Sequence, residues 1–531
     1  MLRGATTARA PQGARAPTNK WLVTVSITFG SLMGTIDASI VNVAVPHLSG
    51  SLGATVEQIT WMTTGFALAN VVVMPLTAFL GRLFGQKRVY MSCMVLFLVG
   101  SALCGMARSL PLLVACRVLQ GLGAGALLPT EQAIMRQTFP PEEQGMAMAM
   151  FGIAVMLGPA FGPTLGGFIV DHWGWPWIFY INLPVGLLGL FMVHSFVHEP
   201  EDLRAANAAA AAHQRRHLDW PGVALLSVGL GALQYVLEEG MRKDWLQDRA
   251  IAALALVAVV ALLFFVARER TATAPAVNLS LLKDKVFVSA TIIGGFMYAM
   301  LMAVTFLLPV FMQNLLGYTA VQSGLALMPR TLVMIVATPL VGRLHGKVQP
   351  RFVVAFGLLC FCASTWFMGH YTLLTSMRQL IFPVVIQGLG FSCLFVPLAT
   401  VAMATVDRRK LADAAGLNSL VRQIGGSLGL AVFATLMSRY LVQIKAAIGA
   451  HVSVGRPEVT QRLSAMTQGF LARGYDPDSA RLATHRVLGA AVTRQANVLL
   501  FEKLFLLAGV VFLCVLPLLW FLKAPRPAPE K

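Results

Sequence analysis

Stretches of about twenty predominantly apolar residues recur along this chain from Trp21 to Leu522, and they constrain its fold more than any other feature. Each stretch is long enough to cross a hydrocarbon core about 30 Å thick as a helix. The composition agrees, since 57% of the residues are hydrophobic and only 12% are charged. A soluble enzyme, a secreted disulfide-rich domain and a disordered chain are therefore excluded. The sequence predicts an all-α polytopic membrane protein.

Charged residues, prolines and glycines divide the apolar stretches into fourteen expected transmembrane helices. The helices are expected at residues 21–46, 57–80, 88–107, 110–135, 146–170, 176–197, 219–238, 250–267, 286–312, 322–342, 351–370, 379–404, 413–437 and 497–522. The basic segment 1–20 is expected to be a disordered tail, and 523–531 a second tail. We do not expect a cleaved signal peptide, because the stretch after Trp21 is long, contains Asp37 and lacks a small-residue cleavage site.

Lys and Arg residues are unevenly distributed between the two sides of the predicted membrane. With the amino terminus in the cytoplasm, 24 of the 41 Lys and Arg residues lie in the tails and loops of that side, and five in the short opposite loops. Cytoplasmic loops of membrane proteins are enriched in positive charge. We therefore expect both termini to be cytoplasmic, in a multi-pass protein of the cytoplasmic (inner) membrane. The net charge of +18 is then a topology signal, so the lipid bilayer is an expected partner and nucleic acid is not.

The sequence offers little for catalysis or metal binding. It contains neither an H-E-x-x-H motif nor a P-loop, and its seven cysteines all lie in apolar stretches. Two histidine pairs, His194 with His198 and His213 with His217, have a spacing that can hold zinc, but no Cys or carboxylate completes either set. We expect no enzymatic activity, no metal and no cofactor.

Two short motifs recur at about half the chain length. Gly81–Gly85 and Gly342–Gly346 share a Gly-Arg-Leu-x-Gly pattern 261 residues apart, and the Gln-Gly-Leu-Gly motif that begins at Gln120 returns at Gln387, 267 residues later. Duplicated halves are typical of secondary transporters that alternate the access to a central site. The expected organisation is a six-helix half at 21–197, two inserted helices with flanking cytoplasmic loops at 198–285, and a second six-helix half at 286–522.

One sizeable polar segment, residues 439–496, is expected on the outer side of the membrane. Val459, Leu463, Met466 and Phe470 recur with the spacing of an amphipathic helix. Two interpretations remain open: a helical hairpin that folds back on the outer surface of the protein itself, or a docking face for another protein.

Motifs in the first six spans resemble those of the fourteen-span drug:proton antiporters of the major facilitator superfamily, the EmrB/QacA type. The resemblance is carried by Thr35–Pro46 in the first span, Leu113–Gly123 in the fourth, Gly158–Gly167 in the fifth and Trp173–Gly186 at the start of the sixth. It implies a major facilitator fold and proton-coupled export of amphipathic drugs or toxic compounds, with protons as the only coupling ion. EmrB-like relatives work with a periplasmic adaptor protein, whereas QacA-like relatives work alone, so such an adaptor is a possible partner.

Only two of the 23 carboxylates, Asp37 and Glu131, fall well within predicted spans. An ionisable group in a bilayer costs several kcal/mol and is a functional candidate by default. Arg117 and Asp37 are expected at similar depths, roughly 10 and 13 Å from the outer ends of their spans, and can pair if those spans are neighbours. The resemblance places both in proton-coupling motifs; a purely structural ion pair is the alternative. Glu131 is either a second proton carrier, an acidic group that attracts cationic drugs, or an interfacial residue that snorkels.

A second set of residues is expected to control conformation. The glycines and prolines of span five suggest a bend that closes the cavity on one side, whereas simple packing through small residues is the alternative. In the loop between spans two and three, Arg82 stands where the superfamily pattern has Asp, which puts the usual charge relay of that loop in doubt. The expected conformational residues are Gly158, Pro159, Gly162, Pro163, Gly166, Gly167, Gly81, Arg82, Gly85, Lys87 and Arg88.

Candidates for substrate contact are less sharply defined. They are polar or aromatic residues expected inside the spans, namely Asn42, Gln120, Tyr298, Phe306 and Arg422. For Arg330 and Arg422, helix packing and carbonyl capping are alternative roles. Three functions remain open: broad export of amphipathic compounds, narrow export of one metabolite, lipid or siderophore, and, from a different class, a membrane receptor that does not transport.

Overall fold

The computed structural model describes residues 19–198, 219–272, 275–452 and 456–522, and within these ranges the chain forms helices and no strands. The expected tails 1–20 and 523–531 lie outside the described residues, apart from Asn19 and Lys20. These two residues begin the first helix, because the Asn19 side chain accepts a hydrogen bond from the backbone N–H of Trp21 and caps the helix.

Ten helices make up the described part of the segment before residue 285. They are α1 (Lys20–Leu52), α2 (Val56–Phe84), α3 (Gln86–Gly105), α4 (Leu110–Ala124), α5 (Leu127–Thr138), α6 (Gln144–Trp173), α7 (Trp177–Tyr180), α8 (Asn182–Phe196), α10 (Trp220–Glu239) and α11 (Arg249–Glu269). The rest consists of α12 (Lys285–Asn314), α13 (Ala320–Arg343), α14 (Pro350–Met368), α15 (Met377–Ala404), α16 (Leu411–His451), α17 (Pro457–Leu471) and α18 (Pro477–Leu513).

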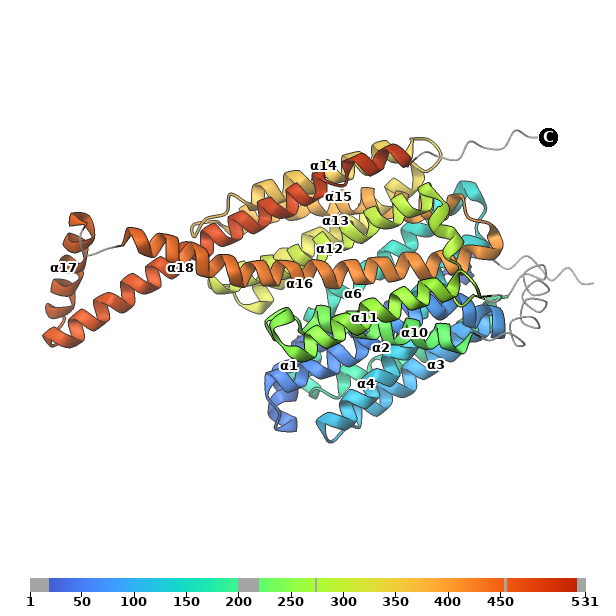
Figure 1. Cartoon of the computed structure of the whole chain (residues 1–531), viewed down its shortest axis with the longest axis horizontal. Coiled ribbons are helices and arrows are strands. Elements are labelled where there is room, and N and C mark those ends of the chain that lie inside the picture. Colours follow the sequence, from blue (N-terminus) through green and yellow to red (C-terminus); the bar gives the residue numbers. More distant parts are fainter. Residues whose placement is uncertain (1–18, 199–218, 273–274, 453–455, 523–531) are drawn as a thin grey trace, which may run out of the picture.

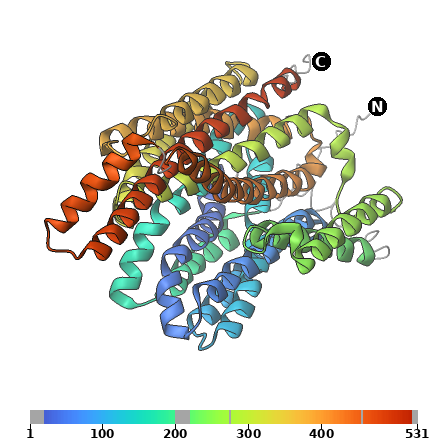
Figure 2. The same ribbon diagram turned by 60° about the vertical axis from the view of Figure 1, so that its left-hand side comes forward.

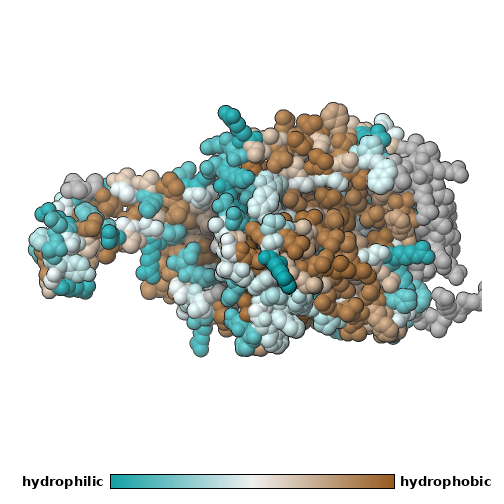
Figure 3. Space-filling model, turned by 90° about the horizontal axis from the view of Figure 1, so that it is seen from below, coloured by the Kyte–Doolittle hydropathy of each residue, from teal (hydrophilic) through white to brown (hydrophobic). Residues whose placement is uncertain are grey.

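The predicted membrane fold is confirmed. Thirteen segments of the described chain are long and apolar enough to cross a membrane, and α6, with 30 residues, is also long enough. In chain order these segments correspond to the fourteen predicted spans. Figure 3 shows the broad apolar surface that this produces around the body of the bundle, with polar residues toward both of its ends.

The fourth predicted span is not one uninterrupted helix. Within this span α4 ends at Ala124 and α5 begins at Leu127, with Gly125 and Ala126 between them. A continuous apolar stretch does not reveal such a break, because a turn inside the bundle leaves the hydropathy unchanged. The break lies between the two polar groups of the span, Arg117 on α4 and Glu131 on α5.

The repeated Gln-Gly-Leu-Gly motif packs in the same way in both halves. A Cβ atom added at Gly121 of α4 would lie 2.4 Å from the carbonyl oxygen of Phe66 on α2, and one at Gly388 of α15 would lie 2.5 Å from that of Arg330 on α13. The second glycine of each motif, Gly123 or Gly390, similarly meets the backbone of α3 or α14. The glycines therefore allow three helices of each half to approach closely.

Matching capping boxes start the second helix of each half. The side chain of Thr55 accepts from the backbone of Gln58 at the start of α2, and Thr319 and Gln322 repeat the arrangement at α13. In each box the glutamine side chain accepts in return from the threonine backbone N–H. Both boxes satisfy orphan N–H groups at helix ends.

The two halves meet along α2 and α16 on one side and along α6 and α13 on the other. The inserted hairpin of α10 and α11 lies against the first of these seams, because α10 packs on both α2 and α16. Figures 1 and 2 show the hairpin beside these helices. The insertion is thus attached to both halves.

The polar segment 439–496 differs from the predicted outer loop. α16 and α18 continue without interruption beyond the bundle and project from it together, with α17 at their tip (Figure 1). In the described part of the chain α17 packs mainly on α18, so the hairpin does not fold back on the bundle surface as one interpretation expected. The continuation of α16 and α18 beyond the bundle was not predicted, because both helices stay regular while their surface changes from apolar to polar.

Substitution of Gly123 tests the close approach of α3 and α4. We expect Gly123→Ala to destabilise the protein by about 1–3 kcal/mol, because the added methyl group lies 2.6 Å from a backbone nitrogen that must shift. Gly231→Ala in α10 is the matched control, since a Cβ atom there meets no atom within 4 Å. The measurement is the apparent unfolding temperature in detergent, and equal values for both variants would contradict this account of the packing.

Candidate functional site

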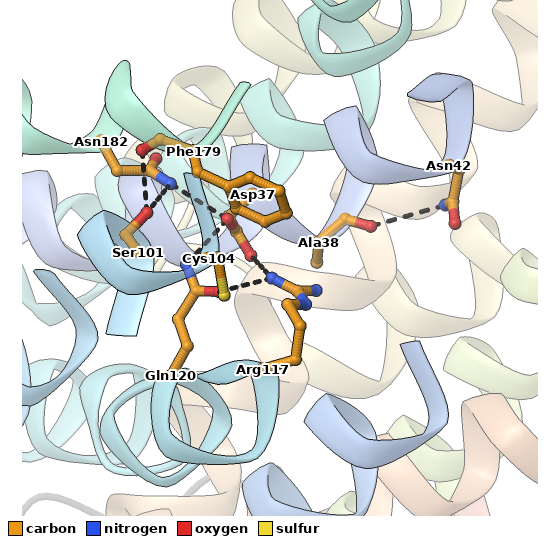
Figure 4. A network of polar contacts seen from close by, with 9 residues as sticks. All are labelled: Asp37, Ala38, Asn42, Ser101, Cys104, Arg117, Gln120, Phe179 and Asn182. Atoms are coloured by element: carbon orange, nitrogen blue, oxygen red, sulfur yellow. Dashed lines mark hydrogen bonds and ion pairs between the residues drawn. The ribbon is translucent and has the colours of Figure 1, made fainter. Parts of the chain in front are cut away.

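A buried ion pair lies inside the first half. Arg117 Nη1 of α4 donates to Asp37 Oδ2 of α1 at 2.6 Å, and the two side chains are 1% and 0% exposed. Gln120 Nε2 and Asn182 Nδ2 donate to the other carboxylate oxygen at 2.9 and 3.0 Å. Figure 4 shows these three donors converging on Asp37 from two other helices, α4 and α8.

A second layer of contacts fixes these donors. Arg117 Nη1 also donates to Gln120 Oε1 at 2.6 Å, and its guanidinium lies 4.2 Å from the ring centroid of Phe66. Asn182 Nδ2 also donates to Ser101 Oγ at 3.0 Å, and that hydroxyl donates to the carbonyl of Phe179. Every carboxylate oxygen of Asp37 is therefore paired, as a charge in a medium of low dielectric requires.

Local sequence explains the meeting of these groups. Arg117 and Gln120 are three residues apart and project from one face of α4. Asn182 is the first residue of α8, and the short helix α7 before it places Phe179 beside Ser101. Asn182 lies within one of the sequence motifs, whereas Ser101 lies in none of them and was not predicted. A polar residue in an apolar span was the available signal, but Ser is too common in such spans to stand out.

Glu131 is separate from this network. It is fully buried on α5, and Thr28 Oγ1 of α1 donates to its Oε1 at 3.4 Å. Within the described residues no ion pair to Glu131 is present. Its burial inside the protein does not fit the snorkelling alternative, whereas both roles in proton or drug binding stay open.

The glycines of the predicted fifth span pack α6 against α1. Cβ atoms added at Gly158, Gly162 and Gly166 would lie 2.4 to 2.7 Å from atoms of α1, whereas Gly167 has room for one. α6 runs as one helix through this region, so the expected bend does not interrupt it. The side chains of Pro159 and Pro163 lie outside the described residues. Small-residue packing accounts for the described contacts.

Arg82 joins the two halves. Its Nη1 atom donates to both carboxylate oxygens of Asp413, at 2.9 and 2.8 Å, in the first turn of α16, and Nη2 donates to the carbonyl of Pro275 at 3.2 Å. The sequence showed that the usual Asp is replaced; the structure shows which carboxylate the replacing cation meets. The other motif residues act locally: Gly85 has a φ of 89°, and Lys87 donates to the His194 carbonyl, while Arg88 is exposed.

The substrate-contact candidates do not form one site. Gln120 belongs to the Asp37 network, whereas Asn42 is exposed and donates to the backbone carbonyl of Ala38 on its own helix (Figure 4). Arg422 of α16 is buried between the halves, where it donates to Gln132 Oε1 of α5 at 3.4 Å and lies over the Phe395 ring. Tyr298 of α12 is half-buried beside this part of α16, and Phe306 lies two turns further along α12.

No metal or esterase site emerges from the described residues. No group of three potential metal ligands is present among them, and His213 and His217 lie outside the described ranges. A G-x-S-x-G pattern, which the sequence analysis overlooked, does occur at Gly425–Gly429. It lies in the middle of α16, and its Ser427 accepts from Gln234 of α10 rather than from a histidine. An esterase needs this pattern at a strand-to-helix turn.

Comparison with known proteins decides the family. The model of the major facilitator superfamily matches residues 27–430. The chain belongs to the major facilitator superfamily. It is 31% identical to the "Fatty acid resistance protein FarB" of Neisseria gonorrhoeae, over 95% of this chain and 96% of that one. It is also 31% identical to the "Multidrug export protein EmrB" of Escherichia coli (strain K12), over 95% of both chains.

Solved structures agree on the fold. The human organic anion transporter MFSD10 superposes with a TM-score of 0.57 at 14% identity, over 94% of this chain and 100% of that one. The relatives place this superfamily member in the branch of EmrB- and FarB-type efflux transporters, as the sequence motifs predicted. It is a multi-pass membrane transporter and not an enzyme.

The ion pair between Arg82 and Asp413 is expected to be a major attachment between the halves of this superfamily member. Arg82→Asp should lower the free energy of unfolding by about 3 kcal/mol, because Asp413 is buried and loses its counter-charge. Adding Asp413→Arg should recover part of the loss. The measurement is a double-mutant cycle on unfolding in detergent, with Arg88→Asp as an exposed control. Strictly additive effects would show that the two groups are not coupled.

Proposed function

We propose that this transporter exports amphipathic compounds in exchange for protons, and that Asp37 carries the proton. The supporting observation is a carboxylate buried at membrane depth, held by one cation and two amide donors that belong to other helices. Because these partners sit on α4 and α8, a shift of either helix relative to α1 changes the number of donors that face Asp37. The charge state of Asp37 is then linked to conformation.

In this exchange Asp37 binds and releases a proton as Arg117 moves away from it and returns. With Arg117, Gln120 and Asn182 in place, Asp37 is stable as an anion. When movement withdraws Arg117, an uncompensated buried carboxylate costs several kcal/mol, and binding a proton removes that cost. Return of Arg117 then expels the proton. Inward movement of one proton charge supplies about 2.3 kcal/mol per 100 mV of membrane potential, which drives export of a compound against its gradient.

Glu131 is the second proton carrier in this proposal. It lies on the same predicted span as Arg117, beyond the break between α4 and α5, and Thr28 attaches it to α1 as well. The two carboxylates thus lie at different heights along α1, Asp37 on the helix itself and Glu131 beside Thr28. The excess of Lys and Arg supports a cytoplasmic position for the end of the bundle opposite α17 and for both termini. α17 and its hairpin then lie on the outer side.

Amphipathic compounds of several kinds are the proposed substrates. The names of the relatives refer to fatty acid resistance and to multidrug export. Arg422, Gln132 and Phe395 place a cation, an amide and an aromatic ring between the halves, which suits compounds with one polar and one apolar part. A panel of unrelated compounds in an efflux-deficient host tests breadth: protection against a single compound would favour the narrow exporter.

Asp37→Asn tests proton coupling. The variant keeps the size of the side chain but has no titratable group, so efflux driven by an imposed pH gradient should fall to background. Exchange of labelled for unlabelled substrate, which needs no net proton movement, should persist in the same proteoliposomes. Asp478→Asn, an exposed carboxylate at the start of α18, is the matched control. Gradient-driven efflux by Asp37→Asn at the wild-type rate would reject Asp37 as the carrier.

The projecting hairpin is proposed to contact a periplasmic adaptor protein. We expect deletion of residues 455–472 to spare membrane insertion, because α17 packs mainly on α18 beyond the bundle, and to reduce export. The half-buried apolar stripe of α17 faces this hairpin, so a partner meets the exposed side instead. Cysteines at exposed Arg462 and Gln468 should cross-link to a partner in whole cells, whereas one at half-buried Met466 should not. Intact export after deletion, with no adduct, would exclude the hairpin from the mechanism.

A further inference from the structure

A cavity opens between the two halves at the end of the bundle opposite α17. It has a volume of about 1020 Å³. The first half contributes the end of α5 and the segment Phe139–Gln144 before and at the start of α6. The second half contributes the loop His345–Pro350 between α13 and α14, the end of α15 and the short turn that includes Arg408. The cavity lies far along the chain from Asp37 and shares no residue with its network.

The charge of this cavity is positive. Arg136, Lys347 and Arg408 line it, against a single carboxylate, that of Glu142. Lys347, Arg408 and Glu142 are exposed, whereas Arg136 is only 8% exposed. Arg408 reaches across the seam, since its Nη2 atom donates to the carbonyl of Gln137 next to Arg136. Cations from both halves are therefore gathered around one space.

Arg136 lacks a counter-charge. Its Nη1 atom is buried and has no hydrogen-bond partner among the described residues, and no ion pair to it is present there. A buried guanidinium without a partner is unfavourable by several kcal/mol. The positive charge of Arg136 also affects His345, which lines the same cavity. Burial lowers the pKa of His345, and the charge of Arg136 lowers it further. An anion bound in the cavity would therefore supply the negative charge that Arg136 lacks among the described residues.

We propose that this cavity binds the phosphate group of an anionic ligand, with Arg136 as the principal contact and Lys347 and Arg408 at the mouth. A phosphate group offers several acceptor oxygens, and a guanidinium binds two of them side by side. Phe139, Val401 and Met403 also line the cavity and provide an apolar wall for whatever carries the phosphate. Basic pockets between transmembrane helices at this side of a membrane are suited to the headgroups of anionic lipids.

A phosphate group here would bridge the two halves. Arg136 belongs to the first half and Lys347 and Arg408 to the second, so one anion in the cavity contacts cations from both sides of the seam. Its binding stabilises the arrangement of the two halves around this cavity. The proposal concerns ligand binding by the protein in this conformation and does not depend on proton coupling or on the identity of the transported compound.

The experiment uses the purified full chain in lipid nanodiscs, with the apparent unfolding temperature as the readout. Three conditions are compared: phosphatidylcholine alone, phosphatidylcholine with phosphatidylglycerol, and phosphatidylcholine with inorganic phosphate in the buffer. The variants are Arg136→Gln, the double variant Lys347→Gln with Arg408→Gln, and Arg343→Gln. Arg343 is an exposed residue at the same end that does not line the cavity, so its substitution controls for a general loss of positive charge.

We expect phosphatidylglycerol to raise the unfolding temperature of the wild type and of Arg343→Gln equally. The shift should fall to less than half in Arg136→Gln and in the double variant. The same pattern with inorganic phosphate would identify a soluble phosphate compound as the source instead of a lipid. If Arg136→Gln does not fold, the double variant decides. Equal shifts in all four proteins, or no shift in any of them, would overturn the proposal.

Discussion

The ion pair between Asp37 and Arg117 constrains how the helices of the first half are positioned. Two opposite charges in a medium of low dielectric are tolerable only while they stay together with their hydrogen bonds, and separating them exposes the cost of each. Gln120, Asn182 and Ser101 meet this requirement from α3, α4 and α8. The helices that carry these side chains must therefore keep their relative positions closely enough to preserve the hydrogen bonds.

Glycines make that precision possible. In the absence of water, helices in a bilayer gain little from burying apolar side chains and rely on close packing. α1 meets α6 through Gly158, Gly162 and Gly166, and α4 meets α2 and α3 through Gly121 and Gly123. The backbones on either side of the ion pair are thus in near contact. The second half repeats the α4 arrangement with Gly388 and Gly390. Its buried cation differs, because Arg330 donates to the neutral side chains of Thr305 and Gln387 and not to a carboxylate.

Sequence predicted those features that follow from local composition or from a single unusual residue. The fourteen spans, the repeated motifs and the presence of a buried Asp and Arg all have this character. Pairings between distant segments were out of reach: nothing near Arg82 identifies Asp413, and nothing near Arg136 indicates an unpaired cation. The projecting hairpin was missed for a different reason. α16 leaves the bundle without any change in its backbone, so no proline or glycine marks the exit, and only the surface character changes.

The inserted hairpin has a consequence for how this molecule can open toward lipid. α10 lies against α2 and α16 and covers the seam between the halves on that side. The other seam, between α6 and α13, has no inserted helix over it among the described elements. If the halves rock, a gap that forms beside α10 is lined by protein, whereas a gap beside α6 and α13 faces the acyl chains. The insertion therefore makes the two sides of an otherwise pseudo-symmetric transporter different: protein covers one seam, and the other seam lies next to lipid.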